Sequence, residues 1–331
     1  MSQNIIVTGG AGYIGSHMCK VLKEKNYHPI TIDNLSTGHK ESVKYGDFIQ
    51  GDIKDYDLLI DTFKKYNPIG VMHFAACAIV SESMEDPKKY YSNNTSNTIN
   101  LLNAMIEANI KNIIFSSTCA TYGIPQFTPL TEDHPTNPIS PYGQSKLMIE
   151  KILKDYSKAY SLNYAALRYF NAAGADIDLD IGEKHEMETH LIPIAIETAL
   201  NVRDILNVYG CDFETKDKTA IRDYIHVLDL ASAHIKALEY IQKNNKSITL
   251  NLGTENGFSV LEVVDMVEKI SGKKLKIKLT NKREGDPAKL FANANLAKKL
   301  LNWELKHSSL ETIVNTAYRW HQKQQKVVLK K

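Results

Sequence analysis

Tyr142 and Lys146 form a Tyr-x-x-x-Lys pair, a spacing that suits proton transfer to and from a hydroxyl group. Ser140 and Pro141 stand just before the pair and favour a helix that starts here. Side chains four residues apart share a helical face, so the Lys146 ammonium should lie beside the Tyr142 phenol. Because a nearby cation stabilises the phenolate, we expect the pKa of Tyr142 to fall below its free value of about 10. Tyr142 would then act as a base near neutral pH.

Three hydroxyl side chains, Ser116, Ser117 and Thr118, close an apolar run that begins at residue 112. Such a strand end lies at the carboxyl edge of a parallel sheet, where the ligands of α/β proteins bind. One of these hydroxyls would bridge a substrate oxygen and Tyr142. The set indicates hydride transfer at a secondary alcohol, without saying whether the hydride stays on a cofactor.

A glycine-rich turn follows the first predicted strand, and a helical pattern begins directly after it. Gly9 permits the tight turn, Gly12 lets the backbone approach a pyrophosphate, and Gly15 allows close packing of helix on strand. The helix N-terminus then faces the phosphates. Asp33 ends the second strand at about the 20-residue offset expected for the group that binds the adenosine ribose. Its carboxylate would repel a 2′-phosphate, so we expect NAD, whose positive nicotinamide would lower the Tyr142 pKa further.

Short apolar or β-branched runs alternate with helical patterns through the first half, as in βαβ units with a parallel sheet. The predicted strands are residues 4–7, 28–33, 45–50, 70–74, 112–116 and 163–170. The predicted helices between them include residues 15–25, 56–66, 93–108 and 140–160. The expected fold class is α/β, a doubly wound parallel sheet of the Rossmann type with a smaller C-terminal α/β domain.

The pattern loosens after residue 171. We predict helices over 190–202, over 228–242 and from 259, strands over 224–227, 248–251 and 274–279, a loop over 211–222, and a frayed tail of Lys and Gln residues. The lysines of 274–279 are interpreted as a solvated strand face rather than a nucleic-acid site. Residues 1–171 should form an NAD-binding domain to which segments near 223–252 return, and residues 172–331 a substrate-binding domain.

The composition narrows the class of protein. A formal net charge of +2 over 331 residues gives no reason to expect nucleic acid or an anionic membrane as a partner. No apolar run approaches the roughly 20 residues of a membrane span, and the start of the chain leaves no room for a signal peptide. The four cysteines are scattered without a Cys-x-x-Cys pair, so neither a disulfide framework nor a metal site is expected. The expected compartment is the cytoplasm.

The Gly-x-x-Gly-x-x-Gly spacing resembles the extended branch of the short-chain dehydrogenase/reductase superfamily, as do the segments at residues 51–53 and 73–76. The resemblance places Thr118 at the catalytic Ser/Thr position beside Tyr142 and Lys146. The cofactor contacts that it implies are Gly9, Gly12, Tyr13, Ile14, Gly15, Asp33, Asn34, Asp52, Ile53, Phe74, Ala75, Asn94, Tyr142, Lys146 and Phe170.

Four later motifs, at residues 168–171, 190–193, 222–227 and 283–286, resemble the successive signatures of UDP-glucose 4-epimerases, which interconvert UDP-glucose and UDP-galactose. Arg222 and Arg283, which belong to the last two motifs, offer planar, always-charged donors for phosphate oxygens. The resemblance assigns the uridine ribose to Asp286, the diphosphate-sugar region to Asn171, and the uracil to His190 and Leu191. The implied substrate contacts are Thr118, Tyr142, Asn171, His190, Leu191, Tyr209, Arg222, Arg283, Asp286 and Leu290.

The implied reaction keeps the hydride within one catalytic cycle. Tyr142 takes the proton of the sugar C4 hydroxyl while the C4 hydride moves to a tightly bound NAD, which gives a 4-keto sugar. The keto sugar rotates and presents its other face, and hydride and proton return with inverted configuration. NAD is regenerated each cycle and need not leave.

Other reactions remain to be separated. A sugar 4,6-dehydratase is disfavoured, because Cys119 and Ala120 follow Thr118 where an acid and a base would be needed. An epimerase of another nucleotide sugar, or a net nucleotide-sugar dehydrogenase or reductase, stays open. A non-enzymatic NAD-binding relative is disfavoured, since both Tyr142 and Lys146 are present.

Four positions depart from the family pattern. Thr118 replaces the serine of many members and should be tolerated, because it keeps the hydroxyl. His190 stands where several members have asparagine, and Ala78 where some have lysine. Leu290 stands where some relatives have a tyrosine that narrows the sugar pocket, which raises the hypothesis that N-acetylated UDP-hexosamines also fit. By resemblance, the apolar faces of helices 93–108 and 140–160 pair across a two-fold axis, so a homodimer is expected.

Overall fold

The computed structural model describes residues 2–283 and 285–328 of the chain, and its largest element is a sheet of seven parallel strands. Continuous apolar runs form these strands because both faces of the sheet are covered. The strands are β1 (Asn4–Thr8), β2 (His28–Asp33), β3 (Asp47–Gln50), β4 (Gly70–His73), β5 (Asn112–Thr118), β6 (Asn163–Tyr169) and β10 (Ile248–Leu252).

The strand order fixes where a ligand can bind. It reads β10-β6-β5-β4-β1-β2-β3, so the chain reverses direction across the sheet between β1 and β4. Ligands of doubly wound folds bind in the crevice at such a point, outside the carboxyl ends of the strands. Gly9 directly follows β1 and Phe74 directly follows β4, which places both predicted cofactor residues at this crevice.

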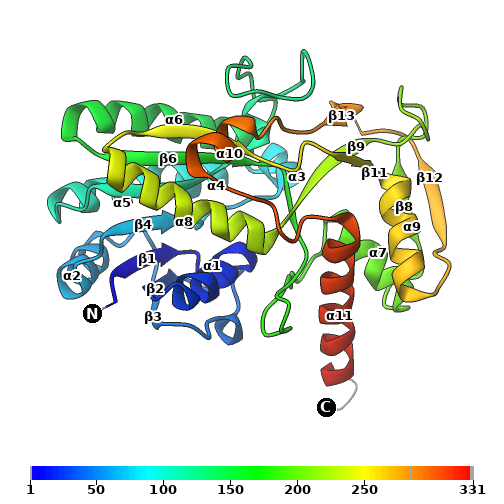
Figure 1. Cartoon of the computed structure of the whole chain (residues 1–331), viewed down its shortest axis with the longest axis horizontal. Coiled ribbons are helices and arrows are strands. Elements are labelled where there is room, and N and C mark those ends of the chain that lie inside the picture. Colours follow the sequence, from blue (N-terminus) through cyan, green and yellow to red (C-terminus); the bar gives the residue numbers. More distant parts are fainter. Residues whose placement is uncertain (1, 284, 329–331) are drawn as a thin grey trace.

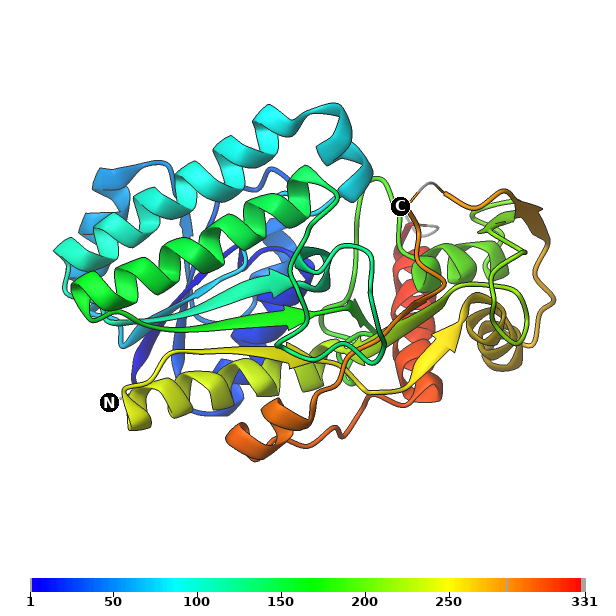
Figure 2. The same ribbon diagram turned by 90° about the horizontal axis from the view of Figure 1, so that it is seen from above.

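Helices cover both faces of the sheet (Figures 1 and 2). Alternate strand residues point to opposite faces, so Ile5 and Val7 pack into one apolar core while Ile6 packs into the other. Helices α1 (Tyr13–Glu24), α8 (Val227–Asn244) and α10 (Asn295–Leu301) belong to the first core. Helices α2 (Tyr56–Tyr66), α5 (Asn97–Glu107) and α6 (Pro141–Tyr160) belong to the second.

The remaining elements form a smaller α/β region beside the carboxyl edge of the sheet (Figure 2). Its strands are β7 (Asn171–Ala173), β9 (Ile221–His226), β11 (Gly257–Ser259) and β13 (Lys289–Leu290) in one sheet, with β8 (Leu206–Tyr209) and β12 (Ile277–Thr280) as a separate pair. Helices α7 (Leu191–Ala199), α9 (Val260–Ser271) and α11 (Leu310–Val328) share a third apolar core with these strands.

Short helical segments complete the chain. They are α3 (Val80–Glu85), α4 (Pro87–Tyr90), the π-helix Tyr91–Ser96 and the 3₁₀ turns Lys40–Ser42 and Cys119–Thr121. The π-helix leads straight into α5, so the helix predicted over 93–108 is only partly regular. None of the helices in the described residues is long and apolar enough to cross a membrane.

The predicted α/β fold class, a doubly wound parallel sheet with a smaller α/β region, is confirmed. Several segment predictions were wrong at their ends. The strand predicted from residue 45 begins at Asp47, and the loop predicted through Arg222 gives way to β9 at Ile221. The strand predicted over 274–279 occupies Ile277–Thr280, and its side chains are largely exposed, as expected of a solvated face.

The prediction of a frayed C-terminal tail was also wrong within the described residues. Helix α11 runs to Val328, and it is held by long polar side chains that reach carbonyls of other segments. Lys323 Nζ donates to the Leu179 carbonyl at 2.8 Å and Gln325 Nε2 to the Leu200 carbonyl at 3.1 Å. The sequence did not predict that this helix packs on the rest of the chain, because the side chains that hold it are themselves polar. The two final lysines lie outside the described residues.

Candidate functional site

The glycine turn between β1 and α1 has the geometry that its spacing predicts. Gly9 has φ +73°, and a Cβ there would lie 2.6 Å from the Ala75 nitrogen. A Cβ on Gly15 would lie 2.2 Å from the Gly9 oxygen. A Cβ on Gly12 would meet nothing nearer than the Gly9 oxygen at 3.3 Å, so this side of the turn is open to a ligand. The turn therefore fits the diphosphate of a dinucleotide at the N-terminus of α1.

Asp33 lies at the end of β2, next to this turn. Its Oδ2 accepts from the Ala11 backbone N–H at 2.9 Å, and its Oδ1 accepts from the Leu35 N–H at 2.8 Å. A carboxylate offers about four lone-pair positions, so two remain for further donors. The arrangement suits the two hydroxyls of a ribose.

The other predicted cofactor residues gather at the same edge of the sheet or on the helices behind it. Asn34 Nδ2 donates to the Asp52 carboxylate at 2.9 Å, which joins the ends of β2 and β3. Ile53 is buried, and its carbonyl accepts from Asn100 on α5 at 2.8 Å. Phe74 packs against His234 with ring centroids 5.0 Å apart. Tyr13 and Ile14 begin α1, Ala75 follows Phe74, and Phe170 follows β6.

Asn94 occupies the π-helix that precedes α5 and is buried. Its side-chain amide holds the loop after β4, accepting from the Cys77 N–H at 2.8 Å and donating to the Cys77 carbonyl at 2.9 Å. It also donates to Ser145 Oγ at 3.2 Å, between Tyr142 and Lys146 on α6. π-Helical turns are frequent at functional sites, and this one fixes α6 relative to the cofactor edge.

Tyr142, Lys146 and Thr118 meet at the carboxyl end of β5. Ser140 caps α6 by accepting from the Gly143 N–H at 3.2 Å, and this sets the helix start. Tyr142, in the first turn of α6, lies near Thr118 at the end of β5, close enough for the Thr118 side chain to influence the pKa of the phenol. Lys146 is buried, and its Nζ donates to the Ser116 carbonyl at 2.9 Å.

The predicted fall in the Tyr142 pKa is not produced by the protein's own groups. Burial raises the pKa of Tyr142 to about 12, more than the Thr118 side chain lowers it. Burial also lowers the pKa of Lys146 to about 8. The expectation from the i,i+4 spacing was wrong because removal of both groups from water opposes both charges. A phenolate at Tyr142 therefore requires more positive charge beside it than the protein alone provides.

A buried ion pair supports this corner of the site. Arg168 Nε on β6 donates to Glu150 Oε1 on α6 at 2.9 Å, and both side chains are buried. Ser117, next to Thr118, donates to the same Glu150 oxygen. One carboxylate thus ties α6, β5 and β6 together, one helical turn after Lys146.

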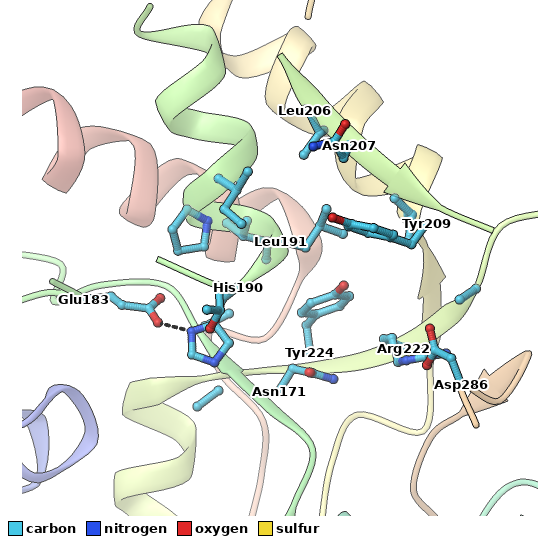
Figure 3. Close-up of a pocket in the computed structure, with 18 of the residues that line it drawn as sticks. Asn171, Glu183, His190, Leu191, Leu206, Asn207, Tyr209, Arg222, Tyr224 and Asp286 are labelled. Atoms are coloured by element: carbon cyan, nitrogen blue, oxygen red, sulfur yellow. Dashed lines mark hydrogen bonds and ion pairs between the residues drawn. The ribbon is translucent and has the colours of Figure 1, made fainter. Parts of the chain in front are cut away.

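A pocket opens between the smaller region and the end of β6, and it collects seven of the ten predicted substrate residues. These are Asn171, His190, Leu191, Tyr209, Arg222, Arg283 and Asp286. Figure 3 labels six of them, all but Arg283, around a common hollow, with His190 and Leu191 at the start of α7 facing Arg222 and Asp286 across it. The motif around Arg283 includes Glu284, which lies outside the described residues.

The charged groups of the pocket are already paired with neighbours. Arg222 forms an ion pair with Asp286, and the Arg283 guanidinium lies 4.0 Å from the centroid of the Tyr209 ring. The pairing holds the Arg222 guanidinium on the pocket wall. Asn171 Nδ2 donates to the Asp223 carbonyl at 2.8 Å.

Thr118, Tyr142 and Leu290 are not among the residues that line this pocket. Thr118 and Tyr142 lie at the sheet edge, and β6, which neighbours β5, leads directly to Asn171 in the pocket. Leu290 lies on β13, in register with Arg222 of β9. The structure thus places the Thr118 and Tyr142 hydroxyls outside the lining of this pocket.

Sequence reasoning missed two glutamates. Glu183 and Glu188 contact His190, and Glu183 lines the pocket. Although burial lowers it, the pKa of His190 rises to about 10 because of the two carboxylates. The available signal was the Glu-x-His-x-x-Glu-x-His spacing of residues 183–190, which places four ionisable side chains in one short segment.

Comparison with known proteins supports a single family. Residues 5–253 match the NAD dependent epimerase/dehydratase family. A UDP-glucose 4-epimerase from Rhizobium meliloti (strain 1021) is 47% identical over 320 residues, which is 97% of each chain. One from Lacticaseibacillus casei is 46% identical over 96% of each chain.

Solved structures give the same result. The UDP-glucose 4-epimerase from Brucella ovis in complex with NAD superimposes with a TM-score of 0.94 at 49% identity, covering 96% of this chain and 98% of that chain. The UDP-Glc/GlcNAc 4-epimerase from Campylobacter jejuni superimposes with a TM-score of 0.86 at 41% identity, covering 97% and 100%. The chain belongs to the NAD dependent epimerase/dehydratase family.

Proposed function

We propose that this chain is an NAD-dependent epimerase that inverts C4 of a UDP-hexose, so that it interconverts UDP-galactose and UDP-glucose. One observation carries the proposal. Tyr142 and Thr118 lie at the same sheet edge as the glycine turn, and β6 leads from this edge into a pocket that contains two arginines. The relatives' names supply the sugar and the nucleotide.

NAD is the cofactor of the proposed reaction, and the residues at the crevice fit it. Gly12 leaves room for the diphosphate, and Asp33 keeps acceptor capacity for the ribose hydroxyls. When bound, NAD accepts the hydride of the sugar C4 and later returns it. Asn34, Asp52, Ile53, Phe74, Ala75, Asn94 and Phe170 line or support its path.

Tyr142 is the proposed base of the reaction. Its phenolate takes the proton of the C4 hydroxyl, and Thr118 donates a hydrogen bond to the same substrate oxygen and keeps it in place. Since burial alone holds Tyr142 in its neutral form, the charges of Lys146 and of the bound cofactor supply the stabilisation that ionisation needs. The proton returns from Tyr142 when the hydride returns.

The pocket residues hold the nucleotide while the sugar turns. Arg222 and Arg283 bind the diphosphate, Asp286 the uridine ribose, and His190 with the Leu191 backbone the uracil. A 4-keto sugar held only through its diphosphate presents either face to the hydride donor. Residues 1–171, together with segments near 223–252, act as the NAD-binding domain, and residues 172–331 supply the nucleotide pocket. Strand β10 and helix α8 of the returning segments lie on the large sheet.

N-acetylated UDP-hexosamines are a second substrate class for the same site. Leu290 lies in register with Arg222 at the border of the pocket and is smaller than a tyrosine. The relative from Campylobacter jejuni is named as a UDP-Glc/GlcNAc 4-epimerase. We expect comparable kcat/KM values for plain and N-acetylated UDP-sugars. The variant Leu290→Tyr should lower kcat/KM only for the N-acetylated sugar. No reaction with UDP-N-acetylglucosamine would refute this extension and leave the main proposal intact.

A homodimer built on α5 and α6 is part of the proposal. Both helices lie on one side of the sheet, joined by a hydrogen bond from Tyr156 to Asn103 at 2.7 Å (Figure 2). Tyr160, near the end of α6, is 48% exposed. Light scattering on the eluted protein should give twice the chain mass, 37.3 kDa, and a mass of one chain would refute the dimer.

The main proposal is tested by incubating the purified protein with UDP-galactose and no added NAD. We expect UDP-glucose to form and approach an equilibrium mixture, without accumulation of free NADH. Stoichiometric NADH would instead identify a net dehydrogenase. No product and no NADH would refute the proposed activity.

A further inference from the structure

We infer that Glu183, His185, Glu188 and His190 form a binding site for one divalent transition-metal ion of the zinc class. The four residues belong to a segment of irregular backbone between β7 and α7, at the side of the nucleotide pocket. Each offers one ligand atom, and these four atoms all lie within 4.8 Å of one another. Of the four, only His190 has a part in the proposed function, as a contact to the uracil, so this inference goes beyond it.

The spacing of the atoms suits a tetrahedral ion. Nitrogen and carboxylate ligands bind zinc at about 2.0–2.2 Å, which separates tetrahedral ligand atoms by roughly 3.3–3.5 Å. Nδ1 of His185 lies 3.3 Å from Glu188 Oε2 and 3.5 Å from Glu183 Oε1, and Nδ1 of His190 lies 3.3 Å from the other Glu188 oxygen, Oε1. Because Glu188 would offer one of its two oxygens, the widest separation among the four ligand atoms, at most 4.8 Å, must close as the ion binds. The His190–Glu183 separation, 2.7 Å, must widen by a few tenths of an ångström to admit the ion.

The charge of the cluster favours a cation. The side chains of Glu183 and Glu188 are only 5% and 4% exposed, so two carboxylates sit close together away from water. Within the described part of the chain, no lysine or arginine forms an ion pair with either of them. The partners of the two carboxylates are instead the imidazoles of His185 and His190. One divalent ion would balance both carboxylates in place of the imidazole protons, which are released as the ion binds.

The surrounding contacts hold the ligands in place. Glu188 Oε1 accepts from the backbone N–H groups of Thr189 and His190 at 2.8 and 2.9 Å. Trp320 Nε1 on α11 donates to the Glu183 carbonyl at 2.9 Å. A Cβ on Gly182 would lie 2.4 Å from the Trp320 ring, so the segment is packed closely on α11. Such supporting hydrogen bonds are typical of sites that orient metal ligands.

Four protein ligands close the coordination shell, so the ion has a structural rather than a catalytic role. His190 immediately precedes α7 and lines the pocket, as Figure 3 shows beside Glu183. Coordination through Nδ1 leaves Nε2 of His190 with a hydrogen as a fixed donor. The ion would therefore hold rigid the wall of the pocket that is proposed to receive the uracil.

Metal content of the intact protein tests the site. After dialysis against zinc and removal of loose ions on a gel column, mass spectrometry should find one zinc per chain. The variants His185→Ala and Glu188→Gln should each lose most of it. His39→Ala, whose imidazole contacts the carbonyl of the neighbouring Lys184 at 3.1 Å, is the matched control and should keep it.

Cobalt gives a readout that does not depend on variants folding. The wild-type protein loaded with Co²⁺ should show the intense visible absorption of a tetrahedral centre, and added Zn²⁺ should remove it. Less than a tenth of an equivalent of zinc in the wild type, an octahedral cobalt spectrum, or full zinc retention in both ligand variants would each overturn the proposal.

Discussion

The two binding regions of this molecule are built in different ways. The cofactor edge is made of backbone turns at the ends of adjacent parallel strands, within about the first half of the chain. The nucleotide pocket is made of side chains from seven separate segments between Asn171 and Asp286. One region depends on where glycines permit close approach, and the other on where charged side chains are held by pairing. Substitutions should therefore affect the two regions separately.

The largest expected effect concerns Tyr142, which serves both regions. Tyr142→Phe removes the proposed base and should lower kcat by about 10²–10⁴-fold, because general acid–base catalysis contributes an effect of that size. NAD content and UDP affinity should not change. Tyr160→Phe, at the exposed end of the same helix, is the control and should retain full activity. Unchanged turnover in Tyr142→Phe would exclude it as the base.

Asp33 tests the cofactor region alone. Asp33→Ala removes the charged acceptor of the ribose hydroxyls and should weaken NAD binding by at least about 10–100-fold, because even one hydrogen bond to a charged group contributes about 1.5–3 kcal/mol. The preference for NAD over NADP should shrink, while UDP affinity should stay constant. Calorimetric titration measures all three quantities, with the exposed Asp57→Ala as control. An unchanged NAD affinity would show that Asp33 serves only the turn.

Lys146, which lies next to Tyr142 on α6, tests how much the burial of a charged side chain destabilises the folded protein. Burial lowers its pKa to about 8, so the folded protein is destabilised below that pH, where the ammonium is charged in both states. Lys146→Met should raise the free energy of unfolding by about 1–2 kcal/mol at pH 7 while abolishing turnover.

The stability difference between wild type and Lys146→Met should depend on pH in a defined window. Between about pH 8 and the unfolded value of 10.5, the folded amine is neutral while the unfolded amine still binds a proton, so the wild type gains stability as pH rises. The advantage of the variant should therefore shrink across this window in urea denaturation. Lys151→Met, exposed on the same helix, should show no such trend, and a constant difference would contradict the assignment.

The smallest expected effect belongs to the pocket. Arg283 is exposed and lies over the Tyr209 ring, so Arg283→Ala should weaken UDP binding by only about 5–10-fold and leave NAD binding unchanged. Arg203→Ala, which removes an exposed arginine paired with Glu197, is the matched control. A loss of NAD affinity in Arg283→Ala would contradict the separation of the two regions.

The same contrast explains what the sequence could predict. The glycine turn, Asp33 and the strand ends are local patterns within βαβ units, so the fold class, the NAD site and the family were all predictable from motifs. The grouping of seven predicted substrate residues in one pocket required the resemblance, because their segments are far apart in the chain. Their individual roles remain predictions.

Features that depend on burial or on long-range contacts were not predictable. The raised pKa of Tyr142 follows from the depth of the site, which a helical spacing does not report. The order of α11 depends on carbonyls of Leu179 and Leu200, more than a hundred residues earlier. The contacts of Glu183 and Glu188 with His190 depend on how one irregular segment folds onto α11.

In the proposed reaction, the hydride removed from C4 returns to the same carbon within one cycle. UDP-galactose carrying deuterium at C4 tests it directly, in the presence of excess unlabelled NADH in solution. We expect UDP-glucose that retains deuterium at C4, with no label in the free NADH. Loss of the deuterium from C4, with its appearance in free NADH, would contradict it.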